Sequence, residues 1–262
     1  MNIVIVTQNA PLYLAQFLDD FLGRITKTSH TVKSIVVLSS YVQKGIMSEL
    51  GERYRCYGFI LFIRLMFRIL KRKILSLIAY FHSGLGCHSV DNVTRKYRVD
   101  KHKTYSVNSE DFLEYININR VDLIVSIAAP MKFKREILNA TGSGCINYHT
   151  ALLPKYRGRQ PLFWALLNEE KEVGISIHEM DEQFDSGPIV VQDKIRVDAN
   201  DTLHSLYLRT IKMGPQLMIE AIGKLDRGCK YRIENNPEKA TYNKFPTRED
   251  VRLFRSRRKR FF

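Results

Sequence analysis

Short, mainly apolar runs alternate with segments of helical periodicity along the first half of this chain. Ile3–Val6, Ser34–Leu38 and Val121–Ala128 have the length and composition of buried strands. Helical spacing of apolar residues runs from Ala10 to Leu22, and a further helix is expected from Ser109. The alternation predicts an α/β fold, Rossmann-like, with a mostly parallel sheet, helices on both faces and ligand sites beyond the carboxyl ends of the strands.

The pattern changes after Gly144. Cys145–Tyr148 is strand-like, Pro161–Asn168 is helical, and Gly174–Met180 and Ile189–Val197 alternate as half-exposed strands do. The second half of the chain is therefore expected to contain further strands and a helix.

A long helix is expected from Thr202 towards Leu225, with Asp201 as its N-cap, Pro215 as a candidate kink and Gly228 as its stop signal. We expect a catalytic domain over residues 1–225, with a basic, apolar helical insertion at about 57–81, and a short basic C-terminal extension over residues 226–262. The last residues, RLFRSRRKRFF, carry too many like charges to pack well by themselves.

Composition excludes several classes of protein. With 45% hydrophobic and 26% charged residues, the 262-residue chain is not a disordered one. Its first twenty residues lack the basic n-region of a secretory signal, and its four cysteines form no CxxC pair. These features predict a cytoplasmic protein with neither a disulfide framework nor a metal site.

The formal net charge of +14 is concentrated in two segments. Residues 57–81 and 248–262 contribute +5 each, which leaves +4 for all the rest. The body of the protein is therefore only mildly basic, so the charge does not indicate a catalytic surface built around nucleic acid.

One polar pair stands out on the strand-like segment that begins at Cys145. Asn147 and His149 are two residues apart, so on a strand their side chains point to the same face. An amide donor for an oxyanion and an imidazole that exchanges protons near neutral pH are two of the groups that acyl transfer needs. Spacing alone also fits an Asn-x-His that simply ends a strand.

Two blocks of sequence form a specific pattern. The residues that carry it are Asn147, His149, Leu152, Leu153, Pro154, Arg157 and Gly158 in the first block, and Asp181, Asp185 and Gly187 in the second. Read together, the blocks resemble the folate-dependent formyltransferases, a family that includes methionyl-tRNA formyltransferases, glycinamide ribonucleotide transformylases and sugar N-formyltransferases. The resemblance covers roughly Val90 to Leu225. Thr150 and Ala151 depart from the residues common in the family, Pro and Ser, at positions without a catalytic role.

The resemblance implies a reaction and the residues for it. Asn147, His149 and Asp185 would transfer a formyl group from 10-formyltetrahydrofolate to an amine, without a metal, and Asp185 would orient His149. His178 and His204 are expected to have structural roles or to lie on the surface. The residues expected to bind the folate are Ala128, Ala129, Pro130, Met131, Leu153, Asp181, Gln183 and Phe184, and those expected to bind the acceptor are Gln8, Asn9, Arg157 and Gly158.

The acceptor is inferred by comparing what the related enzymes carry. A methionyl-tRNA formyltransferase is expected to have a further C-terminal domain where only a short tail follows Leu225, and Thr7–Leu12 is not the Gly/Ser-rich loop of glycinamide ribonucleotide transformylases. A nucleotide-linked aminosugar destined for a surface glycan is therefore the expected acceptor. A methionyl-tRNA formyltransferase-like enzyme that uses the basic tail for tRNA, and a non-catalytic protein that binds folate, membrane or RNA, remain alternatives.

The two basic segments leave further partners open. Arg64 and Arg68 interrupt the apolar run at 57–81, so it is not expected to cross a bilayer. A helix packed on the core, a homodimer contact and peripheral contact with an anionic membrane are the alternatives for this segment. The tail from Arg252 to Arg260 is expected to be a solvated run of charge, with RNA binding as the alternative.

Overall fold

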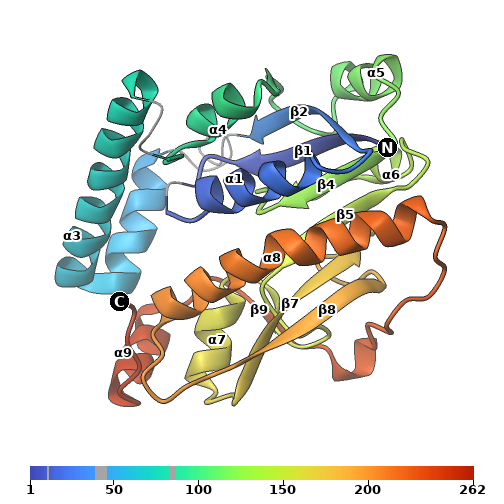
Figure 1. The fold of residues 1–262 in the computed structure, drawn as a ribbon. Helices are drawn as coiled ribbons and strands as arrows, with labels where there is room; N and C mark the ends of the chain where they lie inside the picture. Colours follow the sequence, from blue (N-terminus) through green and yellow to red (C-terminus); the bar gives the residue numbers. More distant parts are fainter. Residues whose placement is uncertain (11, 39–45, 83–85) are drawn as a thin grey trace.

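The structure, a computed structural model, describes residues 1–10, 12–38, 46–82 and 86–262. A seven-stranded sheet of order β3-β2-β1-β4-β5-β7-β8 runs through the molecule (Figure 1). Neighbours from β3 to β5 are parallel, whereas β7 and β8 are antiparallel, so the predicted mostly parallel α/β fold is confirmed. The strands of this sheet are β1 (Asn2–Gln8), β2 (Thr31–Leu38), β3 (Asp100–His102), β4 (Leu123–Ile127), β5 (Cys145–His149), β7 (Glu172–Glu179) and β8 (Ile189–Arg196). A second, two-stranded sheet joins β6 (Arg157–Gly158) to β9 (Tyr242–Asn243).

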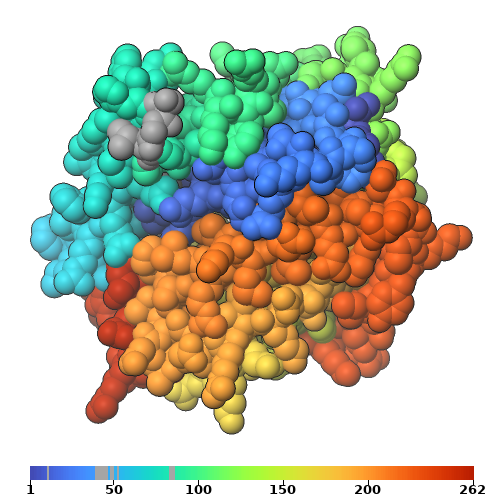
Figure 2. Space-filling model, in the orientation of Figure 1, coloured from blue at the N-terminus to red at the C-terminus, as the bar shows by residue number. Residues whose placement is uncertain are grey.

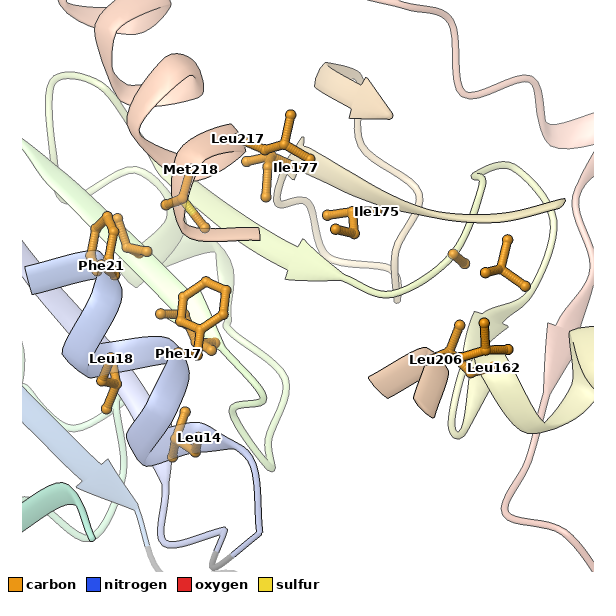
Figure 3. Packing of buried hydrophobic residues seen from close by; sticks show 14 of the residues in the cluster. Leu14, Phe17, Leu18, Phe21, Leu162, Ile175, Ile177, Leu206, Leu217 and Met218 are labelled. Carbon is orange, nitrogen blue, oxygen red and sulfur yellow. The ribbon is translucent and has the colours of Figure 1, made fainter. Parts of the chain in front are cut away.

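Helices cover both faces of the large sheet. On one face α1 and α8 pack together, and Phe17, Phe21 and Met218 belong to the core cluster between them and the sheet (Figure 3). On the other face Phe112 of α5 and Ile137 of α6 pack in a second cluster. The helices are α1 (Leu14–Ile25), α3 (Ile46–Phe81), α4 (Val90–Tyr97), α5 (Glu110–Ile118), α6 (Arg135–Leu138), α7 (Pro161–Leu167), α8 (Leu203–Asp226) and α9 (Arg248–Ser256), with a short 3-10 helix at Pro237–Lys239.

The ends of two helices differ from the prediction. The helix expected from Ala10 begins only at Leu14, and Pro11, within that stretch, lies outside the described residues. The N-cap of α8 is Thr202 and not Asp201, because Thr202 and Ser205 each accept a hydrogen bond from the other's backbone N–H. The Asp201 carboxylate instead accepts from the Ser205 hydroxyl and pairs with an arginine of the same helix.

The structure also tests the kink and the stop signal predicted for α8. It continues as a single helix through Pro215 to Asp226. Its C-cap is Arg227, and Gly228 follows in the left-handed region with a φ of 65°. The stop signal therefore lies one residue beyond the cap.

Helix α3 contains the predicted insertion and stands at one edge of the molecule (Figure 1). Gly58 has a φ of 71° and a ψ of 172°, which no helical residue adopts, so the segment consists of two helices that meet there. Within the described ranges, no helix is both long and apolar enough to span a bilayer.

The C-terminal residues pack on the body of the protein rather than remaining a solvated run. Phe254 is fully buried and stacks on Phe163 of α7, with ring centroids 4.7 Å apart. Phe261 is also buried, against Phe254 and Tyr57. The arginines of this segment are exposed, as expected, but the segment has partners in the body of the protein, because the aromatic residues between the charges supply an apolar side. The division at residue 225 stays a prediction.

Candidate active site

Strand β5 brings Asn147 and His149 to the same face of the sheet, as their spacing predicts. It lies between β4 and β7, with Asn147 opposite His178 and His149 opposite Ser176 across the antiparallel pair with β7. Directly opposite residues in a sheet present their side chains on the same side. The strand register therefore adds a second histidine to the predicted pair.

The carboxylate of Asp185 is the point on which these side chains converge. Its Oδ1 lies 3.3 Å from Asn147 Nδ2, 3.6 Å from His149 Nδ1 and 3.4 Å from His178 Nε2. Its Oδ2 accepts a hydrogen bond of 2.8 Å from the backbone N–H of Gly158. The structure thus brings together all three residues expected to be catalytic, and the Asp185 side chain is only 11% exposed.

The charge of Asp185 is maintained by its neighbours. Burial alone would raise the pKa of this carboxyl, but the nearby His149 and His178 imidazoles and the Gly158 N–H together lower it well below its usual value. The group is therefore a carboxylate at neutral pH.

His178 is a site residue that the sequence interpretation missed, since it expected a structural or surface histidine. It is 2% exposed, and its Nδ1 lies 2.7 Å from the backbone O of Glu179. Donation of that N–H leaves Nε2 between two partners, Asn147 Nδ2 at 3.2 Å, from which it accepts when unprotonated, and Asp185 Oδ1 at 3.4 Å, to which it donates when protonated. The feature of the sequence that could have identified His178 is its alternation with Ser176 on one strand. That alternation becomes informative only once the register of the strand with β5 is known.

The loop that carries Gly158 is held by residues from the C-terminal extension. Arg157 N–H donates to the backbone O of Thr241, and Tyr156 N–H donates to the Thr241 hydroxyl. The buried Arg157 guanidinium lies 2.7 Å from Asn235 Oδ1, and Asn235 Nδ2 donates to the backbone O of Asp185 and Gly187. The role expected for Arg157 in acceptor binding stays a prediction, whereas its support of the Asp185 loop is evident.

The two segments expected to line a folate pocket lie next to each other. Met131 and Met180 belong to the same apolar cluster, and the Lys132 ammonium lies 4.6 Å from the centre of the Phe184 ring. Ala128, Ala129 and Pro130 lie immediately after β4, where Ala128 has a φ of 56°. Asp181 accepts from Gln183 N–H and from the Ser186 hydroxyl, and so shapes the turn that leads to Asp185. This proximity fits a shared pocket, and folate binding there stays a prediction.

The remaining predicted residues occupy different surroundings. Thr7 donates its hydroxyl proton to Ile127 O. Because β1 and β4 are parallel neighbours, Gln8 and Asn9 lie at the carboxyl end of β1, next to the carboxyl end of β4. The Leu153 side chain is buried, and its backbone N–H donates to the Ser176 hydroxyl. Contacts of these residues with folate or acceptor stay predictions.

A cavity of about 840 Å³ opens near the other end of β5. Its lining includes Gly144, Asp181, Gln183 and Arg232, but none of the three residues expected to be catalytic. It is therefore not the reaction pocket. In the part of the chain that the structure describes, no group of three His, Cys, Asp or Glu side chains is arranged to hold a metal ion.

Comparison with known proteins adds a family to this geometry. The model of the formyl transferase family matches residues 87–222, just over half of the chain. The methionyl-tRNA formyltransferase of Kosmotoga olearia is 35% identical over 164 residues, which are 63% of this chain and 53% of that protein. The GDP-perosamine N-formyltransferase of Brucella melitensis is 38% identical over 125 residues, 48% of each chain. The chain thus spans about half the length of these relatives.

Solved structures agree on the fold. A sugar N-formyltransferase from Shewanella sp. FDAARGOS_354 superposes with a TM-score of 0.58 at 21% identity, over 98% of this chain and 87% of that one. Glycinamide ribonucleotide transformylase 1 from Symbiobacterium toebii gives a TM-score of 0.59 at 18% identity, over 87% and 88%. The family match, the resemblance of the fold and the convergence of Asn147, His149 and Asp185 have one explanation: the chain belongs to the formyl transferase family.

Proposed function

We propose that this protein transfers a formyl group from 10-formyltetrahydrofolate to a primary amine. The observation that carries the proposal is the convergence of Asn147 and His149 on the buried carboxylate of Asp185. An amide donor, an imidazole and a fixed negative charge are the groups that acyl transfer between nitrogens requires. The membership of the family supports the same chemistry.

Each of the three residues has a separate role in the proposed reaction. The acceptor nitrogen forms a bond to the formyl carbon, and the bond from that carbon to the folate nitrogen breaks. As the amine attacks, the neutral imidazole of His149 takes the proton that the amine loses and becomes an imidazolium, which Asp185 stabilises from 3.6 Å. The formyl oxygen then carries negative charge, and the Asn147 amide and this imidazolium stabilise it. The imidazolium delivers its proton to the departing folate nitrogen.

Asn147 must change partners for this role. Its Nδ2 lies within hydrogen-bond distance of both Asp185 Oδ1 and His178 Nε2, so both of its N–H groups are directed at the protein. One of them has to turn towards the formyl oxygen when substrates bind. Catalytic hydrogen bonds are often completed only in the substrate complex, so this arrangement is compatible with the proposal.

For the acceptor we favour a nucleotide-linked aminosugar. The 38% identity to a GDP-perosamine N-formyltransferase supports this class, and the mildly basic body of the protein suits a diphosphate. The 35% identity to a methionyl-tRNA formyltransferase makes Met-tRNA the second candidate.

The test is a turnover assay with purified protein, 10-formyltetrahydrofolate and a panel of dTDP- and GDP-linked aminosugars, with Met-tRNA alongside. Tetrahydrofolate release and a mass gain equal to one formyl group on an acceptor are the expected results. His149→Ala should abolish both, and replacement of the exposed His82 by Ala should leave both unchanged.

The outcomes separate the alternatives. Formylation of Met-tRNA alone would keep the chemistry and overturn the sugar acceptor. Saturable folate binding without turnover on any acceptor would favour a non-catalytic protein. Equal turnover by wild type and His149→Ala would contradict the proposed mechanism.

A further inference from the structure

The second half of α3 presents its apolar side to solvent. Among the described residues, ten of the twenty exposed large hydrophobic side chains lie within residues 59–81. Seven of them follow one another at spacings of three and four, which keeps them on one side of a helix. We call this set the α3 stripe: Ile60, Ile63, Phe67, Leu70, Ile74, Leu77 and Phe81.

The side of this helix that faces the body is the more polar one. Arg68 reaches His204 Nε2 at 3.0 Å and lies 4.1 Å above the ring of Phe262. Ser76 donates its hydroxyl proton to Ser89 Oγ, and the Ser76 carbonyl accepts from Asn92. A helix on the surface of a globular domain normally buries its apolar side; here Leu65 is buried and Leu61 packs on the core, but the α3 stripe stays exposed. Figure 2 shows the helix, in cyan and teal, along the edge of the molecule.

Basic residues flank the α3 stripe, and the sequence from Arg53 to Val90 contains no acid. At about 100° per residue, Arg64 and Lys71 lie along one border of the stripe and Lys73 along the other. All three are exposed. Apolar residues bordered by basic ones match a bilayer interface, where the apolar side chains enter the acyl region and the cations meet lipid phosphates.

Charge also argues against a second copy of the chain as the occupant. The spacing of the stripe resembles a coiled-coil seam, in which the flanking positions set the choice of partner. Here those positions hold Arg64, Lys71 and Lys73, and pairing two copies would bring charges of one sign together without an acid to balance them.

We propose that the α3 stripe docks the protein on the surface of an anionic membrane, with the helix lying in the interface. The inference rests on α3 alone and is independent of the formyl-transfer proposal.

The test is co-sedimentation of the full chain with phosphatidylcholine vesicles that contain or lack phosphatidylglycerol. We expect binding to the anionic vesicles that weakens as salt is raised. The triple variant Phe67→Gln, Leu70→Gln and Ile74→Gln should bind at least about 100-fold more weakly. A control with three exposed hydrophobic residues from elsewhere replaced, Tyr105→Gln, Tyr231→Gln and Leu253→Gln, should bind as the wild type does.

A second pair of variants separates local charge from total charge. Arg64→Gln, Lys71→Gln and Lys73→Gln together should weaken binding about 100-fold, since each basic residue near an anionic surface is worth roughly a fivefold change in affinity. The same three charges removed from the tail, by Arg248→Gln, Arg252→Gln and Arg258→Gln, should have a much smaller effect.

Three results would overturn the proposal. The first is that the wild type does not bind anionic vesicles. The second is that the stripe variant, with an unchanged circular dichroism spectrum, binds as tightly as the wild type. The third is that the wild type is a dimer in sedimentation velocity and the stripe variant a monomer, while neither binds vesicles; this result would assign the stripe to a second copy of the chain.

Discussion

Replacing Asp185 by Asn tests the centre of the proposed mechanism while it preserves the shape of the side chain. The carboxylate faces the Gly158 N–H through Oδ2 and His149 Nδ1 through Oδ1. An Asn at this position satisfies Gly158 only with its amide oxygen on that side, so its NH₂ group must face His149. His149 Nε2 already lies 2.9 Å from the Tyr156 carbonyl. In the variant an N–H group would face Nδ1 from 3.6 Å in place of the carboxylate oxygen, which opposes a proton on that nitrogen.

The size of the effect follows from the distance. Unit charges 3.6 Å apart interact by about 4.6 kcal/mol at an effective dielectric constant of about 20, which suits this mostly buried pair. This energy is the most that Asp185 contributes to the imidazolium at His149. Its loss corresponds to a fall of about 10³-fold in kcat, at about 1.4 kcal/mol per tenfold change in rate.

Tetrahydrofolate release, followed with whichever acceptor the panel identifies, measures this effect. Asp185→Asn should lower kcat by about 10³-fold, whereas the exposed Asp100→Asn should be neutral. Urea denaturation should show that the variant is folded, with a loss of about 1–3 kcal/mol in the free energy of unfolding. A kcat within tenfold of the wild type would refute the electrostatic role given to Asp185.

Three further predictions concern the supports of the site. A Cβ on Gly187 would lie 2.0 Å from the backbone O of Glu179, so Gly187→Ala should lower the free energy of unfolding in urea by about 1–3 kcal/mol, whereas Gly142→Ala, with open space around it, should not. Phe254→Ala should cost about 3–5 kcal/mol by the same measurement, and an unchanged midpoint would mean that the tail does not pack in solution. The pKa of Asp185 is lowered on folding, so its contribution to stability is present above its unfolded pKa of about 3.9 and is lost as the pH falls through the folded value; acid titration should therefore destabilise wild type more than Asp185→Asn.

The sequence predicted well that Asn147 and His149 share a strand, because the evidence for this is local. Two side chains at i and i+2 on a strand share a face whatever the rest of the chain does, and the structure has Asn147 and His149 so placed. Asp185 came from the resemblance alone. Its contact depends on a turn after β7 in which it adopts a φ of 53°, a conformation that non-glycine residues rarely take and that no periodicity reveals.

The site residues that the sequence did not reveal are positioned by contacts between distant segments of the chain. His178 reaches the site through the register of β5 with β7, and Asn235 through a contact with Arg157 across 78 residues of sequence. The N-cap of α8 was misassigned for a local reason, because two adjacent residues, Asp201 and Thr202, both have side chains suited to capping. Only the capping box with Ser205 distinguishes them.

The contacts of Thr241 and Asn235 with the Gly158 loop have a consequence for how the protein is made. A ribosome has already produced β5, both histidines and Asp185 before it reaches these residues. Until they emerge, the loop that donates to Asp185 lacks the strand beside it and the amide that fixes the Asp185 turn. The nascent chain therefore carries Asn147, His149 and Asp185 before the residues that hold their loop, and this arrangement can be completed only after Thr241 has been made.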